Sequence, residues 1–148
     1  MLAASTSAAL GQVVTTPLYA FTGFLTPLST AGTLASPTIS PSQNFGSAVP
    51  VKWTLKDASG ALVTRLTSTT LLKAVQNTAC SVPAPAGAKE LILYQPTSGA
   101  SGGSTFRYST NQFVFNWDTS KGASRGCWEI VLLLDDGSPA RATILNLK

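Results

Sequence analysis

Carboxylates are the side chains of this sequence that come closest to acid–base or metal chemistry. There are six of them: Asp57, Glu90, Asp118, Glu129, Asp135 and Asp136. Two facing carboxylates can hydrolyse a glycosidic bond, and the adjacent Asp135 and Asp136 could offer oxygens to Ca²⁺. The aspartates, however, lie in turn-type segments, where Asp is favoured because it bonds its own backbone, and a Ca²⁺ site needs about six to eight oxygens. We therefore predict structural turns and assign no catalytic, cofactor or metal-binding residue.

Histidine is absent from the sequence, which removes the usual base of a serine hydrolase and the commonest metal ligand. A Ser–Lys dyad would need Lys52 or Lys73 to be buried with a lowered pKa, and Lys52 alternates with apolar residues in a way that places it in solvent. Lys52, Asn116 and Glu129 could instead form a Lys–Asn isopeptide crosslink, as some surface adhesin modules do. We expect a protein that is not an enzyme and keep the crosslink as an alternative staple.

Cys80 and Cys127 are the two cysteines of the chain. An even pair in a chain that is poor in charge and rich in Ser and Thr favours an oxidising compartment. We predict a Cys80–Cys127 disulfide, which would stabilise the fold by about 4 kcal/mol on the chain-entropy model. The expected location is secreted or at the cell surface.

Basic side chains are spread along the chain and form no patch. Ten Lys and Arg against six Asp and Glu give a net charge of +4, and no two basic residues are adjacent. Nucleic-acid binding needs basic residues gathered on one face, so we do not expect it. No stretch reaches the roughly eighteen apolar residues of a membrane span, so no membrane span is expected either.

The aromatic residues support two interpretations. On strand-like segments such rings are usually core, and we predict this role for Trp53, Phe113, Phe115 and Trp117. Tyr94 and Tyr108 lie beside a glycine-rich loop and a hairpin turn, so they are the candidates for ligand contact. Exposed rings could stack on sugars, which makes a carbohydrate-binding module the alternative function.

Strands are the elements predicted to position these residues. Residues 49–56 alternate apolar and polar side chains with the period of two that buries one face of a strand, and Asp57-Ala58-Ser59-Gly60 has the composition of a type I turn. The other predicted strands are residues 19–25, 38–39, 61–66, 71–79, 89–94, 105–108, 112–117, 127–134 and 140–147. A short helix over 69–76 competes for one segment.

Strands about ten residues apart, with turn chemistry between them, are typical of a β-sandwich. We therefore predict an all-β fold, an immunoglobulin-like antiparallel β-sandwich of seven to nine strands. It forms one domain over residues 17–148. Residues 1–16 are expected to be a flexible or strand-donating N-terminal tail.

The motif Pro50-Val51-Lys52-Trp53 resembles the signature of the bacterial Pro-x-Lys-Phe (PxKF) domain family, with Trp53 in place of the family's Phe. Further similar stretches are Phe21-Thr22-Gly23-Phe24, the 113–117 segment, Gly126-Cys127 with the 132–137 segment, and Arg141-Ala142. The resemblance spans residues 17–148. It implies an immunoglobulin-like module of secreted or cell-surface proteins, without catalytic residues.

These features together predict a non-catalytic extracellular module with a structural or adhesive role. Its partners would be other proteins or like subunits, contacted through loops and sheet edges. The strand-competent tail suggests a variant in which residues 1–16 add to the sheet edge of the next subunit and build a filament. Glycans are the partner in the alternative, carbohydrate-binding interpretation.

Overall fold

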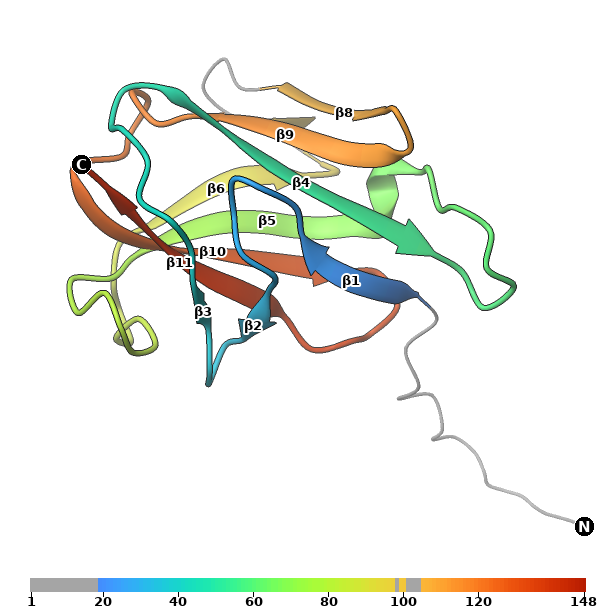
Figure 1. Ribbon diagram of the computed structural model, residues 1–148, viewed down its shortest axis with the longest axis horizontal. Helices are drawn as coiled ribbons and strands as arrows, with labels where there is room; N and C mark the ends of the chain where they lie inside the picture. Colours follow the sequence, from blue (N-terminus) through green and yellow to red (C-terminus); the bar gives the residue numbers. More distant parts are fainter. Residues whose placement is uncertain (1–18, 98, 101–104) are drawn as a thin grey trace, which may run out of the picture.

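The alternation of residues 49–56 produces the long strand β4 (Ala48–Lys56). The computed structural model describes residues 19–97, 99–100 and 105–148 (Figure 1). Every second side chain of β4, from Val49 to Leu55, is fully buried, while the residues between them are partly exposed. The predicted tail over 1–16, with its filament-building role, lies outside the described residues.

The described residues form eleven strands in two sheets that face each other (Figure 1). The four-stranded sheet has the order β1-β4-β9-β8, and its other strands are β1 (Ala20–Phe24), β8 (Thr105–Ser109) and β9 (Gln112–Asp118). The seven-stranded sheet has the order β2-β11-β10-β5-β6-β7, with β3 pairing parallel to β11. Its strands are β2 (Gly32–Thr33), β3 (Thr38–Ile39), β5 (Thr69–Gln76), β6 (Glu90–Gln95), β7 (Gly99–Ala100), β10 (Gly126–Leu134) and β11 (Arg141–Leu147).

This topology confirms the predicted immunoglobulin-like β-sandwich. The orders β1-β4-β9-β8 and β11-β10-β5-β6 reproduce the A-B-E-D and G-F-C-C′ sheets of such domains. Three of the eleven strands, β2, β3 and β7, have two residues each. The other eight strands agree with the predicted seven to nine. The competing helix over 69–76 is wrong, because this segment is β5 and pairs with β10 on one side and β6 on the other.

The return strand predicted over residues 61–66 does not form. The turn before it is confirmed, since the Asp57 carboxylate accepts the N–H groups of Ser59 and Ala61. Only a bridge between Lys56 and Leu62 follows, after which the chain crosses to the other sheet through the 3₁₀ turn Leu66–Ser68. The reason is that β4 already lies between β1 and β9 and has no free edge for a long partner.

The predicted aromatic core is confirmed: Trp53, Phe113, Phe115 and Trp117 are at most 1% exposed. Trp53 stacks on Phe113 at 5.6 Å between ring centroids, across the β4–β9 pair. The strands predicted over 105–108 and 112–117 pair as a hairpin through the turn next to Tyr108, with Thr110 and Asn111 both at positive φ, as a two-residue hairpin turn requires. The inner faces of the two sheets are therefore closed by packed rings.

Candidate functional site

Strand β10 presents two chemically different faces. Trp128, Ile130 and Leu132 belong to the core between the sheets. The alternate residues Cys127, Glu129 and Val131 point the opposite way, onto the outer face of the seven-stranded sheet. The loop of residues 77–89, which joins β5 to β6, contributes the residues that cover this outer face. We call it the 77–89 loop.

The predicted disulfide is confirmed, and it holds the 77–89 loop on the outer face. Cys80 in the loop is bonded to Cys127 on β10, with their Cα atoms 5.3 Å apart. In antibody domains the conserved disulfide joins the two sheets instead. Here the aromatic packing joins the sheets, and the disulfide stabilises a loop.

Asn77 fixes the start of the same loop. Its side chain is fully buried. Its amide donates to the Val82 carbonyl at 2.6 Å and its side-chain oxygen accepts the Ala79 N–H at 3.1 Å, while its own N–H donates to the Cys127 carbonyl at 2.8 Å. These bonds satisfy polar groups that would otherwise be costly to bury, and they fix the start of the loop against β10.

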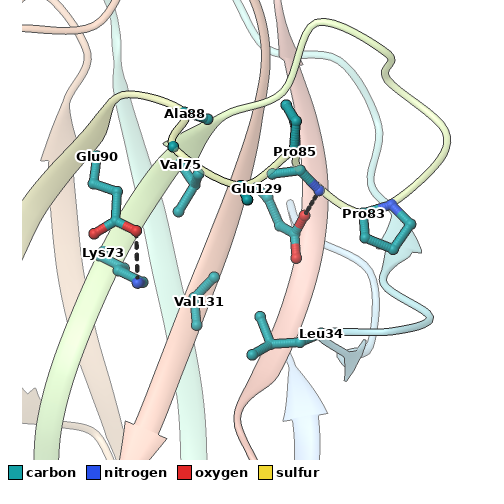
Figure 2. A pocket seen from close by; sticks show the side chains of 12 residues that line it. Leu34, Lys73, Val75, Pro83, Pro85, Ala88, Glu90, Glu129 and Val131 are labelled. Atoms are coloured by element: carbon teal, nitrogen blue, oxygen red, sulfur yellow. Dashed lines mark hydrogen bonds and ion pairs between the residues drawn. The ribbon is translucent and has the colours of Figure 1, made fainter.

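Glu129 is the buried carboxylate beneath this loop. Its side chain is 2% exposed, and its Oε1 atom accepts the N–H of Ala84 at 2.9 Å. The other oxygen, Oε2, has no hydrogen-bond partner among the described residues; Figure 2 shows it pointing to the side where Leu34 and Val131 lie. Burial raises the pKa of the Glu129 carboxyl, against the opposing effects of the Ala84 N–H and the charge of Lys73.

A cavity of about 270 Å³ lies between the 77–89 loop and the sheet. Its lining residues are Leu34, Lys73, Val75, Pro83, Ala84, Pro85, Ala86, Gly87, Ala88, Glu90, Glu129 and Val131. Lys73 forms an ion pair with Glu90 at 3.0 Å (Figure 2), and the Glu129 carboxylate has no ion-pair partner of its own among the described residues. The cavity thus combines aliphatic side chains with a carboxylate whose Oε2 has no hydrogen-bond partner among the described residues, and this combination can orient a small polar group.

The candidate crosslink of Lys52, Asn116 and Glu129 is wrong. In the four-stranded sheet Lys52 lies opposite Val114, and Asn116 lies opposite Pro50. Glu129 is on the other sheet and faces away from the core. The carboxylate that such a reaction needs is therefore on the far side of the sandwich from the lysine.

The aspartates predicted to be turn residues are confirmed in that role. Asp57, Asp118 and Asp136 each accept the hydroxyl of the serine two positions later at 2.6 Å. The serine hydroxyl bonds are the main cause of the lowered pKa of Asp57 and of Asp118. Within the described residues, no group of three or more His, Cys, Asp or Glu could hold a metal ion.

The two tyrosines proposed for ligand contact are not exposed. Tyr94 is 7% exposed and its ring lies 4.4 Å from that of Phe106, so burial raises its pKa. Tyr108 is partly buried, with its ring edge-on to Phe113 at 4.9 Å. Tyr94 lies opposite Leu72 in the β5–β6 pair and shares its inward direction, so it belongs to the core, and its assignment as a ligand contact is wrong.

A second polar cluster holds the start of β1. The Tyr19 hydroxyl donates to Asp135 and accepts from Arg65 at 2.7 Å, and the Tyr19 N–H donates to Asp136. Burial and the hydrogen bond to Asp135 raise the pKa of Tyr19. Because these groups pair with one another, the cluster positions the start of β1.

In the sequence, Glu129 stands out only as a candidate for the isopeptide crosslink, and the cavity that it lines is not predicted. The useful signal is a single carboxylate inside the apolar run of residues 127–134, two positions after a disulfide cysteine. A buried acid in such a strand must face either the core or a loop that covers the outer face of the sheet. The neighbouring disulfide cysteine indicates where such a loop is attached.

Comparisons with known proteins identify no relative. The chain matches no protein-family model, no curated protein and no solved structure. The resemblance to the Pro-x-Lys-Phe domains therefore stays a prediction from its motifs. In the part of the chain that the structure describes, no helix has the length and apolarity to cross a membrane.

Proposed function

We propose that this protein is a non-catalytic extracellular module that binds a protein partner through the outer face of its seven-stranded sheet. The observation that carries this proposal is the distribution of exposed apolar side chains. Among the described residues the large exposed hydrophobics are Leu34, Ile39, Leu62, Val82 and Ile92. All but Leu62 lie on β2, β3, β6 or the loops attached to them, and grouped exposed apolar residues are typical of interaction surfaces.

The stapled loop makes this face a suitable binding surface. Leu34 lines the cavity and Val82 belongs to the 77–89 loop. Ile92 lies opposite Lys73 in the β5–β6 pair and so shares the outer face with it. A surface already held by a disulfide loses little conformational entropy when a partner binds, and a disulfide suits an oxidising, extracellular environment.

No observation favours the carbohydrate alternative. Every aromatic side chain in the described residues is buried or partly buried, so no ring is presented as a stacking platform. Adhesive or structural binding through a protein partner is therefore the function that we propose.

Selection of peptides from a random phage library on the disulfide-intact protein tests the proposal. We expect the selected peptides to lose binding to Leu34→Asp and Ile92→Asp. The matched control is Leu62→Asp, which replaces a residue on the connection after β4 whose exposure lies between those of Leu34 and Ile92, and it is expected to keep binding. Peptides that bind all three variants equally would place the binding surface elsewhere.

A further inference from the structure

Glu129 is a buried acid whose second oxygen is unused. Glu129 is 2% exposed, and within the described residues only its Oε1 atom has a hydrogen-bond partner. Oε2 is not one of the fully buried, unpartnered side-chain atoms of the described residues, so it is open to the cavity and can be reached from it. The simplest group to complete this site is a donor that enters the cavity and reaches Oε2.

The charges around the cavity favour a cationic donor. Two carboxylates and one ammonium group line it: Glu90, Glu129 and Lys73. Lys73 is paired with Glu90 at 3.0 Å, so the single ammonium group is shared between two carboxylates, and the lining has one negative charge in excess. Pro83 and Pro85 in the covering loop also have no N–H, so the lining has fewer donors than an ordinary loop would provide.

The geometry of the carboxylate favours an ammonium over a guanidinium. An arginine binds a carboxylate best through two parallel hydrogen bonds, one to each oxygen. In Glu129 the Ala84 N–H already occupies Oε1, whereas a lysine ammonium needs only one oxygen.

The size and walls of the cavity fit an alkyl stem. The cavity holds about 270 Å³, while pockets for whole drug-sized ligands run from about 300 to 1,000 Å³. Leu34, Val75 and Val131 offer aliphatic walls, against which the methylene groups of a lysine side chain pack well.

We propose that this cavity receives a lysine side chain of the partner protein, with its ammonium group on Oε2 of Glu129. This inference rests on the proposed function, because it assumes that the outer face of the seven-stranded sheet is the binding surface. It assigns to the partner one exposed lysine as the anchor of the interface. The neighbouring exposed hydrophobics then surround the anchor.

NMR titration of the labelled protein with blocked amino acids tests this assignment. The probes are Nα-acetyl-lysine N-methylamide, the corresponding blocked arginine and blocked norleucine. We expect blocked lysine to shift the amide signals around Ala84, Glu129 and Val131 and to bind more tightly than the other two. Equal binding of blocked arginine or norleucine would overturn the assignment. So would binding of free n-butylammonium without binding of blocked lysine, because the site would then take a small amine and not a partner side chain.

Variants with opposite expected effects separate recognition from loss of structure. Glu129→Gln keeps an acceptor for Ala84 but removes the charge, and we expect it to weaken blocked-lysine binding at least about tenfold. Lys73→Met removes the competing positive charge, and we expect it to tighten binding. Asp57→Asn removes a turn carboxylate that does not line the cavity and is expected to change nothing. Unchanged affinity in Glu129→Gln, or weaker binding in Lys73→Met, would contradict the assignment.

The two proposals can fail separately. If selected peptides depend on Leu34 and Ile92 but blocked lysine does not bind, the surface is right and the lysine anchor is wrong. If blocked lysine binds and no peptide depends on these residues, the cavity binds cations but the protein-binding function is wrong.

Discussion

The two faces of β10 differ in how they are covered. On the inner face, Trp128 packs edge-on against Trp117 of the opposite sheet at 6.3 Å between ring centroids. On the outer face, the cover is the 77–89 loop, held by a disulfide, by the buried amide of Asn77 and by one hydrogen bond to Glu129. Packed rings leave no space, whereas a covalently attached loop can cover a sheet and still leave a cavity beneath it.

This difference explains why the fold can tolerate an unpaired acid at position 129. Rings and aliphatic side chains supply most of the stability through burial, and they lie on the inner faces. The outer face contributes less to stability, so its residues are available for binding.

Adjacent leucines on β10 provide a matched pair for the two faces. Leu132 is fully buried in the core, and Leu133 is partly buried on the outer face. We expect Leu132→Ala to lower the free energy of unfolding by about 2–5 kcal/mol, because it leaves a cavity in a packed core. Leu133→Ala should cost about 1 kcal/mol, since less apolar surface is lost. Equal losses of unfolding free energy in the two variants, measured by denaturant unfolding, would show that the two faces of β10 contribute equally to stability.

Removal of the disulfide should affect the outer face specifically. The double variant Cys80→Ser, Cys127→Ser is expected to lose about 2–4 kcal/mol of stability. Hydrogen exchange should accelerate first at the amides of the 77–89 loop, because this loop loses its attachment while β4 and β9 keep their aromatic packing. Unchanged protection in the loop, with faster exchange in β4, would show that the disulfide supports the core instead.

Glu129→Gln should have the smallest effect on stability and a distinct dependence on pH. Because burial raises the pKa of Glu129 in the folded protein, its contribution is most favourable at low pH and is lost as the pH rises through the folded-state pKa. The wild type and the Glu129→Gln variant should therefore have similar free energies of unfolding in acid. As the pH approaches neutrality, the variant should become the more stable of the two.

The sign of that difference is the informative result. Asp136 has the opposite dependence on pH. Burial opposes its ionisation, but hydrogen bonds from Ser138 and Tyr19 lower its pKa, so its contribution to the free energy of unfolding is lost as the pH falls. Both proteins contain Asp136, and the difference between them isolates Glu129. A variant that is less stable than the wild type at neutral pH would show that the carboxylate is a structural anchor.

Local patterns in the sequence predict the strands well. The alternation from Val49 to Leu55 and the Thr110-Asn111 turn each depend on neighbours a few residues apart, and both are confirmed. The prediction of a strand over 61–66 is wrong, because a turn sequence shows only where the chain can reverse and does not show that a second strand pairs after it. Whether a hairpin forms depends on the free edges of the sheet, and β1 and β9 occupy both edges of β4.

The candidate site is less predictable because it depends on long-range contacts. The sequence shows an acid at 129 in an apolar run, but its cover comes from the loop at 77–89 and from Leu34, far away in the chain. Tyr94 illustrates the same limit of local pattern. It borders a glycine-rich segment, yet the pairing of β6 with β5, with a register shift between Leu72 and Lys73, turns it inward.

The protonation of Glu129 is the most direct measure of whether the cavity is a cation site. Its carboxyl carbon can be followed by NMR across a pH titration, in the free protein and with saturating blocked lysine. We expect a pKa above the ordinary glutamate value in the free protein, and a clear decrease when blocked lysine is bound, because an ammonium favours the ionised carboxylate. An ordinary pKa that blocked lysine does not change would contradict the proposal that Glu129 is the buried anchor of a binding face.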